Sequence, residues 1–169
     1  MQQEAYMKLA LEQAVKGCGW TNPNPMVGAV IVKNDQIIGV GHHEKYGQLQ
    51  AERNALKNCK EDPKGATIYV TLEPCCHHGK TPPCTDAIIE SGITTVVVGS
   101  LDPNPKVAGN GIRILRENGI QVMEGFMKEE CDAINEVFFH YITNGIPYVV
   151  MKYAMTADGK IATHTGASK

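Results

Sequence analysis

The chain has 169 residues, of which 43% are hydrophobic and 20% are charged, so it can bury the core of one folded domain. Its formal net charge is −2 at pH 7, its pI is near 6.3, and no basic stripe runs along it. A long nucleic acid is therefore not an expected partner, whereas a small substrate is compatible with this charge.

The N-terminal segment is amphipathic and carries charges throughout, unlike the basic and then apolar pattern of a signal peptide. No apolar run approaches the ~18 residues of a membrane span. We therefore expect a cytoplasmic location and no membrane contact. In that reducing compartment, thiols or metal ligands are the expected state of Cys18, Cys59, Cys75, Cys76, Cys84 and Cys131.

The predicted elements alternate between helices and strands. Apolar spacing with glycine and proline stops predicts, in the first half, a helix over 4–17, a turn over 21–25, a hairpin of strands at 27–32 and 36–40, a helix over 50–59 and a buried strand over 66–72. In the second half it predicts a helix starting near Cys84, a strand over 94–99, a helix over 110–118, a short strand over 121–125 and a helix over 128–144. This order indicates a three-layer α/β domain with a mixed, five-stranded sheet.

The C-terminal tail does not fit that domain. PYVVMKYAM at 147–155 is predicted to be a strand, and TADGKIA at 156–162 a turn into a further one, with no helix to cover them. We interpret 1–145 as one domain and 146–169 as the opening of a second domain whose remainder is absent. An unpaired apolar strand of this kind also predicts self-association.

Cysteine spacing suggests a metal site. Cys75 ends a predicted strand and Cys84 begins a predicted helix, whose N-terminus favours a thiolate. Two thiolates and a third protein ligand can hold a catalytic zinc, although this spacing alone also fits two unrelated buried cysteines. Glu52 follows a third candidate position, Gln50, at another predicted helix start. In zinc base deaminases, with the signature H-x-E and then P-C-x-x-C, such a glutamate moves the protons of the attacking water.

Several longer motifs strengthen this interpretation: TNPNPMVGAVIV, GHHEKYG, AERNAL, TLEPCCHHGKTPPC and DPNPKVAGNG. Together they resemble the deaminase domain of the bifunctional riboflavin-biosynthesis deaminase/reductase family, over about residues 4–145. The resemblance implies a cytidine-deaminase-like fold, zinc bound by Cys75 and Cys84, and Glu52 as proton shuttle. It also implies a substrate, a diaminopyrimidinone ribosylamino 5′-phosphate, whose 2-amino group is replaced by water.

The resemblance further implies which residues bind the ring or the phosphate of that substrate: Asn24, His43, His77, Lys80, Asp102 and Asn104. Lys80 lies between the two cysteines and suits a phosphate, while each of the others also has a turn or capping interpretation. The tail resembles the first strand and turn of the family's reductase domain, with Lys152 as a substrate contact. NADPH is a cofactor of that domain alone, and 147–169 is too short to form its site.

The chain departs from the family pattern at one ligand. Where the family has H-A-E, this sequence has Gln50-Ala51-Glu52, and an amide oxygen is a poorer zinc donor than imidazole. Three outcomes follow: zinc held weakly through Gln50, a substitute ligand, or an inactive domain without metal. The candidate substitutes are His42, His43, His77, His78 and Cys76.

Other functional classes remain beside the deaminase. A degenerate domain with a structural or assembly role is favoured by Gln50, and opposed by the retention of Glu52, Cys75, Cys84 and Lys80. A nucleic-acid base editor is disfavoured by the acidic charge balance. A homo-oligomer is expected, because deaminases of this fold commonly assemble.

Overall fold

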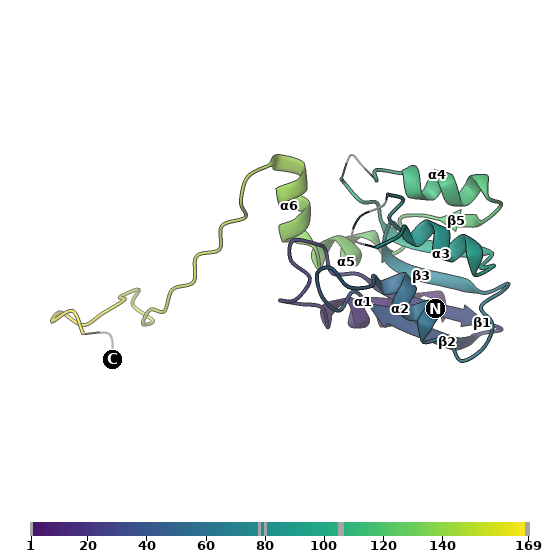
Figure 1. The fold of residues 1–169 in the computed structure, drawn as a ribbon. Helices are drawn as coiled ribbons and strands as arrows, with labels where there is room; N and C mark the ends of the chain where they lie inside the picture. The colour runs from purple at the N-terminus through teal and green to yellow at the C-terminus, as the bar shows by residue number, and fades with distance from the viewer. Residues whose placement is uncertain (1, 78, 80, 105–106, 168–169) are drawn as a thin grey trace.

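The structure is a computed structural model that describes residues 2–77, 79, 81–104 and 107–167. Its sheet has the strand order β2-β1-β3-β4-β5 (Figure 1), formed by β1 (Gly28–Lys33), β2 (Gln36–His42), β3 (Thr67–Leu72), β4 (Thr95–Ser100) and β5 (Gln121–Met123). Strand β1 is antiparallel to β2 and β3, whereas β3, β4 and β5 are mutually parallel. The predicted mixed sheet is confirmed.

Helices cover both faces of this sheet (Figure 1). They are α1 (Gln2–Val15), α2 (Ala51–Lys57), α3 (Cys84–Glu90), α4 (Asn110–Glu117), α5 (Lys128–Ala133) and α6 (Glu136–Asn144). Helices α2, α3 and α4 form one layer, and α1 and α5 pack on the opposite face. The arrangement is the expected three-layer α/β/α fold.

Successive residues of each strand point to opposite faces of the sheet, so the sheet contributes side chains to two hydrophobic cores, one on each face. Ile31 and Val96 belong to the cluster under α2, α3 and α4, while their neighbours Val30 and Val97 pack against α1 and α5. Strands that are buried on both faces consist of nearly continuous apolar residues, and this pattern predicts them from the sequence. Gly28 allows the close approach of α1, because a Cβ there would lie 1.9 Å from the Ala10 carbonyl oxygen.

The carboxyl ends of β3 and β4 meet at one edge of the sheet. The segment 73–77 follows β3, the segment 101–104 follows β4, and the N-termini of α2 and α3 lie beside them. In open α/β sheets, ligands bind outside the carboxyl ends of the strands. The fold therefore brings most of the predicted site residues to one place.

The predicted helix over 128–144 is wrong as a single element, because it divides into α5 and α6. Asn135, with φ −121°, interrupts it. Its Oδ1 accepts a hydrogen bond from the Met26 N–H and its Nδ2 donates to the Met26 carbonyl, both at 2.8 Å. A pair of long-range hydrogen bonds thus replaces local helix geometry at this point.

The predicted strand over 147–155 is also wrong, since the tail has no regular secondary structure within its described residues. Val149, Val150 and Met151 are 83%, 74% and 79% exposed. A strand needs a neighbour for its backbone hydrogen bonds, and no described segment supplies one. Among the described helices, none is long and apolar enough to cross a membrane.

Candidate active site

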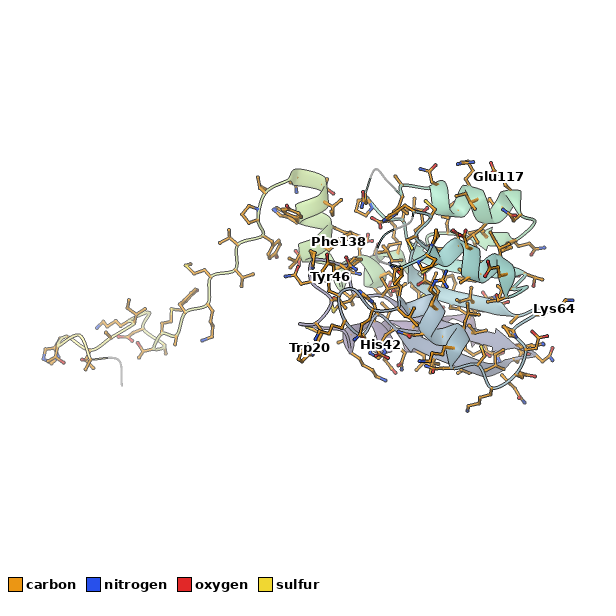
Figure 2. All side chains as sticks on the ribbon, in the orientation of Figure 1. Trp20, His42, Tyr46, Lys64, Glu117 and Phe138 are labelled. Atoms are coloured by element: carbon orange, nitrogen blue, oxygen red, sulfur yellow. The ribbon has the colours of Figure 1, made fainter. Side chains whose placement is uncertain are left out.

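A cleft of about 130 Å³ lies at the carboxyl edge of β3 and β4. It is lined by Asn24, Pro25, Val27, His43, Gln50, Glu52, Leu72, Glu73, Cys75, His77, Asp102, Asn104 and Phe138. A neighbouring hollow of about 360 Å³ shares four of these residues, Asn24, Gln50, Cys75 and His77, so the two form one recess. Phe138 of the cleft and Tyr46 of the hollow lie at the end of the domain from which the tail leaves (Figure 2).

Two cysteines and an amide meet at the floor of this recess. Cys84 is fully buried, and its Sγ lies 3.3 Å from Gln50 Oε1, while its N–H donates to Cys75 Sγ at 3.3 Å. The interaction between the two thiols lowers the pKa of Cys75, whereas the same interaction, together with burial, raises the pKa of Cys84.

Glu52 lies in the first turn of α2 and is 2% exposed. Burial raises its pKa above the ordinary value of 4.5. A hydrogen bond joins Glu52 to Cys84, whereas Glu52 Oε2 is buried without a hydrogen-bond partner among the described residues. A carboxylate oxygen left unpaired in a cleft is suited to exchange a proton with a molecule bound there.

The donor atoms on the floor of the recess suit a zinc ion in part. No group of three or more His, Cys, Asp or Glu residues capable of holding a metal occurs in the described part of the chain. Three donor atoms nevertheless converge, namely the sulfurs of Cys75 and Cys84 and Gln50 Oε1. They fit zinc as two preferred ligands and one weaker one, with the unpaired Glu52 oxygen nearby.

The proposed substitute ligands fit less well. Both ring nitrogens of His43 are engaged, with the Leu49 carbonyl at 3.1 Å and Asn24 Nδ2 at 3.2 Å. His77 lines the cleft, but His42 and Cys76 do not, and His78 lies outside the described residues. Gln50 is therefore the third donor that this arrangement presents.

Asn24 and His43 are joined by a hydrogen bond in the cleft wall. The Leu49 carbonyl can only accept, so His43 Nδ1 carries the proton and Nε2 accepts from the Asn24 amide. His43 is 2% exposed, which holds the ring in place. Because Asn24 Nδ2 is held by His43, the orientation of the Asn24 amide in the cleft wall is fixed.

Asp102 and Asn104, in the segment that follows β4, form another part of the cleft wall. Asp102 Oδ1 accepts the Asn104 N–H at 2.8 Å, a local turn. Burial raises the pKa of Asp102, the negative charge of Glu73 adds to this, and the Asn104 hydrogen bond opposes it. Of the other predicted contacts, Lys80 lies outside the described residues, and Lys152 is exposed in the tail and does not line the cleft.

Several residues of the site were missed from the sequence. Glu73 and Asn135 are buried polar residues that hold loops of the cleft, and Arg53 donates to the carbonyls of Pro82 and Pro83, next to Cys84. Glu73 ends a buried strand inside the TLEPC motif, a signal that could have marked it. The contacts of Asn135 and Arg53 span 109 and about 30 positions, so no local pattern reveals them.

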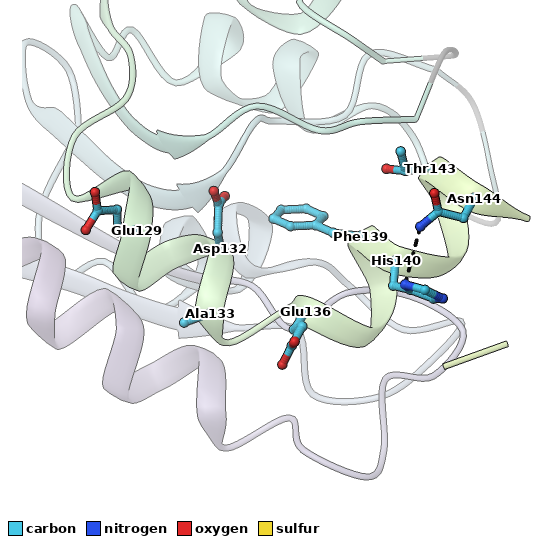
Figure 3. Close-up of a pocket in the computed structure, with 8 residues that line it drawn as sticks. All are labelled: Glu129, Asp132, Ala133, Glu136, Phe139, His140, Thr143 and Asn144. Carbon is cyan, nitrogen blue, oxygen red and sulfur yellow. Dashed lines mark hydrogen bonds between the residues drawn. The ribbon is translucent and has the colours of Figure 1, made fainter. Parts of the chain in front are cut away.

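A separate hollow of about 560 Å³ runs along α5 and α6 (Figure 3). Its lining, which includes Glu129, Asp132 and His140, shares no residue with the cleft. Asp132 already accepts from Ser100 Oγ at 2.5 Å and pairs with Lys128. This surface holds none of the predicted catalytic residues.

Comparison with known proteins agrees with this geometry. Residues 1–100 match the model of the cytidine and deoxycytidylate deaminase zinc-binding region. Riboflavin biosynthesis protein RibD of Actinobacillus pleuropneumoniae is 64% identical, over 97% of this chain and 44% of the relative. The diaminohydroxyphosphoribosylamino-pyrimidine deaminase of Buchnera aphidicola (subsp. Schizaphis graminum) is 51% identical over 87% of this chain and 100% of its own length.

Solved structures give the same result. The deaminase/reductase of Thermotoga maritima superposes with a TM-score of 0.95 at 54% identity, covering 99% of this chain and 49% of that one. The chain thus spans about half the length of the longer relatives that it matches. It belongs to the zinc-binding cytidine and deoxycytidylate deaminase family, and within that family to the deaminase part of the bifunctional riboflavin-biosynthesis proteins.

Proposed function

We propose that this chain hydrolyses the 2-amino group of 2,5-diamino-6-ribosylamino-4(3H)-pyrimidinone 5′-phosphate. Water is consumed, and ammonia and 5-amino-6-(5-phosphoribosylamino)uracil are released. The observation that carries the proposal is the buried, unpaired Oε2 of Glu52 beside the Cys75–Cys84 pair, inside a recess whose two parts hold about 130 Å³ and about 360 Å³. The Buchnera relative, which the chain matches over its full length, is named for this activity.

Glu52 is assigned the proton transfers. Its Oε2 accepts a proton from the attacking water and delivers it to the ring nitrogen next to the amine-bearing carbon, and a second transfer protonates the leaving amine. The raised pKa of this buried carboxyl suits a group that must hold a proton for part of the cycle. Cys75, Cys84 and the Gln50 amide would hold a zinc ion, which would supply a water molecule whose pKa is lowered toward ~7.

The remaining cleft residues are assigned to substrate binding. Asn24, His43, His77, Asp102 and Asn104 all line the cleft. Their amides, imidazoles and carboxylate match the donors and acceptors of a diaminopyrimidinone ring. Lys80 is assigned to the 5′-phosphate on the basis of the resemblance.

The rest of the proposal concerns the longer protein. We assign 1–145 to the deaminase domain and 146–169, with Lys152, to the start of a reductase domain that uses NADPH. The family relationship to deaminase/reductase proteins about twice this length supports that division. A cytoplasmic, homo-oligomeric protein is proposed on the same basis, with no nucleic-acid or membrane partner.

Gln50 supports a second candidate, a domain that keeps the fold for structure or assembly without catalysis. Zinc content and ammonia release of the unmodified chain and of Gln50→His distinguish the two. We expect Gln50→His to bind zinc at least ~10-fold more tightly, since even partners of zinc ligands change metal affinity 10–100-fold. Failure of the variant to gain zinc would refute the assignment of Gln50 as the third ligand. Zinc uptake without ammonia release by either protein would favour the non-catalytic role.

A further inference from the structure

Glu73 is a buried carboxylate with no role in the proposed chemistry. It directly follows β3, is 4% exposed, and lies two residues before Cys75. Its backbone N–H donates to the Ser100 carbonyl at 2.9 Å, which extends the pairing of β3 with β4. The backbone of Glu73 is therefore held by β4, and its side chain projects from a fixed position at the ends of the two strands beside the cleft.

Both oxygens of this carboxylate are occupied by backbone N–H groups. Oε2 accepts from Asp102 at 3.3 Å and from Gly109 at 2.9 Å. Oε1 accepts from Gly111 at 3.0 Å and from Ile112 at 3.3 Å. A carboxylate has about four acceptor sites, so these bonds leave Glu73 little capacity to bind substrate or exchange protons.

The four donors belong to one structural unit. Asp102 begins the loop after β4, and Gly109 to Ile112 form the start of α4, where the N–H groups lack helical partners and favour a negative charge. Gly111 permits the contact, because a Cβ there would lie 2.2 Å from the Pro74 carbonyl oxygen and 3.1 Å from Glu73 Oε1. Glu73 thus ties both ends of the 102–112 segment to the strand that leads to Cys75.

We propose that Glu73 is a positioning residue for substrate binding: it sets the distance between the Cys75 side of the cleft and the wall formed by Asp102 and Asn104. The inference rests on the proposed function and deepens it. Glu73 fixes the Asp102 backbone, Asp102 Oδ1 in turn holds the Asn104 N–H, and both side chains line the cleft. Loss of Glu73 contacts should weaken substrate binding while leaving Glu52 and the thiols in place.

The test uses Glu73→Gln, whose amide has one acceptor oxygen in place of two and so leaves some of the four N–H groups unpaired. We expect the KM for the pyrimidinone ribosylamino phosphate to rise roughly tenfold, the effect of one or two weakened ligand hydrogen bonds, with kcat within about threefold and zinc content unchanged. Gly111→Ala keeps the Glu73 carboxylate but disturbs its contact with α4, because the added Cβ would lie 2.2 Å from the Pro74 carbonyl oxygen and 3.1 Å from Glu73 Oε1, and it should raise the KM in the same way. Glu117→Gln, an exposed change at the far end of α4, is the control.

Two further readouts separate this inference from the proposed function. The Kd of the same substrate, measured in a Glu52→Gln background where turnover is strongly slowed, reports binding separately from chemistry. Hydrogen exchange at Asp102, Gly109 and Gly111 reports the contacts of Glu73. Faster exchange with unchanged Kd and KM would make Glu73 a helix cap only and overturn the inference. Substrate binding without ammonia release by the unmodified chain would instead refute the proposed function.

Discussion

The hydrogen bonds of Asn135 allow a quantitative prediction. Asn135 is 4% exposed and makes two bonds of 2.8 Å to the backbone of Met26. Asn135→Ala removes the side-chain oxygen and nitrogen that make these bonds. The Met26 N–H and carbonyl are then left unpaired in a partly buried site. Each such group costs about 1–3 kcal/mol, so for the two groups we expect the free energy of unfolding to fall by about 2–6 kcal/mol. That is a large part of the 5–15 kcal/mol typical of a domain.

Urea denaturation at fixed zinc concentration measures this loss. Asn118→Ala is a matched control, because Asn118 Nδ2 donates to the Ile114 carbonyl on the exposed surface of α4. Since the Met26 segment also carries Asn24 of the cleft wall, we expect the KM to rise as well. A loss below ~0.5 kcal/mol, the range of ordinary surface changes, would refute the argument that Asn135 anchors this loop to α5 and α6.

Two other predictions concern carboxylates of the cleft. Glu52→Gln should lower ammonia release by about 10²–10⁴-fold, the usual contribution of a general acid–base, with zinc content unchanged; loss of zinc together with activity would contradict a purely proton-transfer role. Asp102→Asn should stabilise the fold at neutral pH. Burial raises the pKa of Asp102, so the folded state binds its proton more tightly than the unfolded state, and stability falls as pH rises from 3.8 through the folded pKa. The gain in unfolding free energy should therefore be larger at pH 7 than below pH 3.8, and equal gains at both would argue against a burial penalty.

The sequence predicted the parts of the site that are specified locally. Glu52 and Gln50 lie at a helix start, and Cys75 and Cys84 flank a loop, so short motifs were enough to find them. Burial on both faces likewise made β3 and β4 visible as apolar runs. The tail at 147–155 is also rich in apolar and β-branched residues, but composition cannot supply the neighbouring strand that a sheet requires.

Glu73 and Asn135 mark what local patterns could not predict. Their partners lie 29 to 39 positions away for Glu73 and 109 positions away for Asn135. The helix break at Asn135 follows from that distant contact, because the helical period continues across 128–144 in the sequence. The reactive centre is thus encoded by motifs, whereas the walls that shape the cleft depend on buried polar residues and the tertiary fold.

This division explains why a change at Gln50 need not disturb the rest of the site. Gln50 is the N-cap of α2, with extended backbone angles, and its carbonyl accepts the Asn54 N–H at 3.0 Å. Its position is therefore set by the helix, and the helix by packing against β1 and β2. Its side chain already reaches the Cys84 sulfur at 3.3 Å. An imidazole at position 50 would extend from the same backbone position toward the Cys84 sulfur. Gln50→His therefore changes the donor atom and its affinity for zinc, while Glu52 and the walls of the cleft keep their contacts.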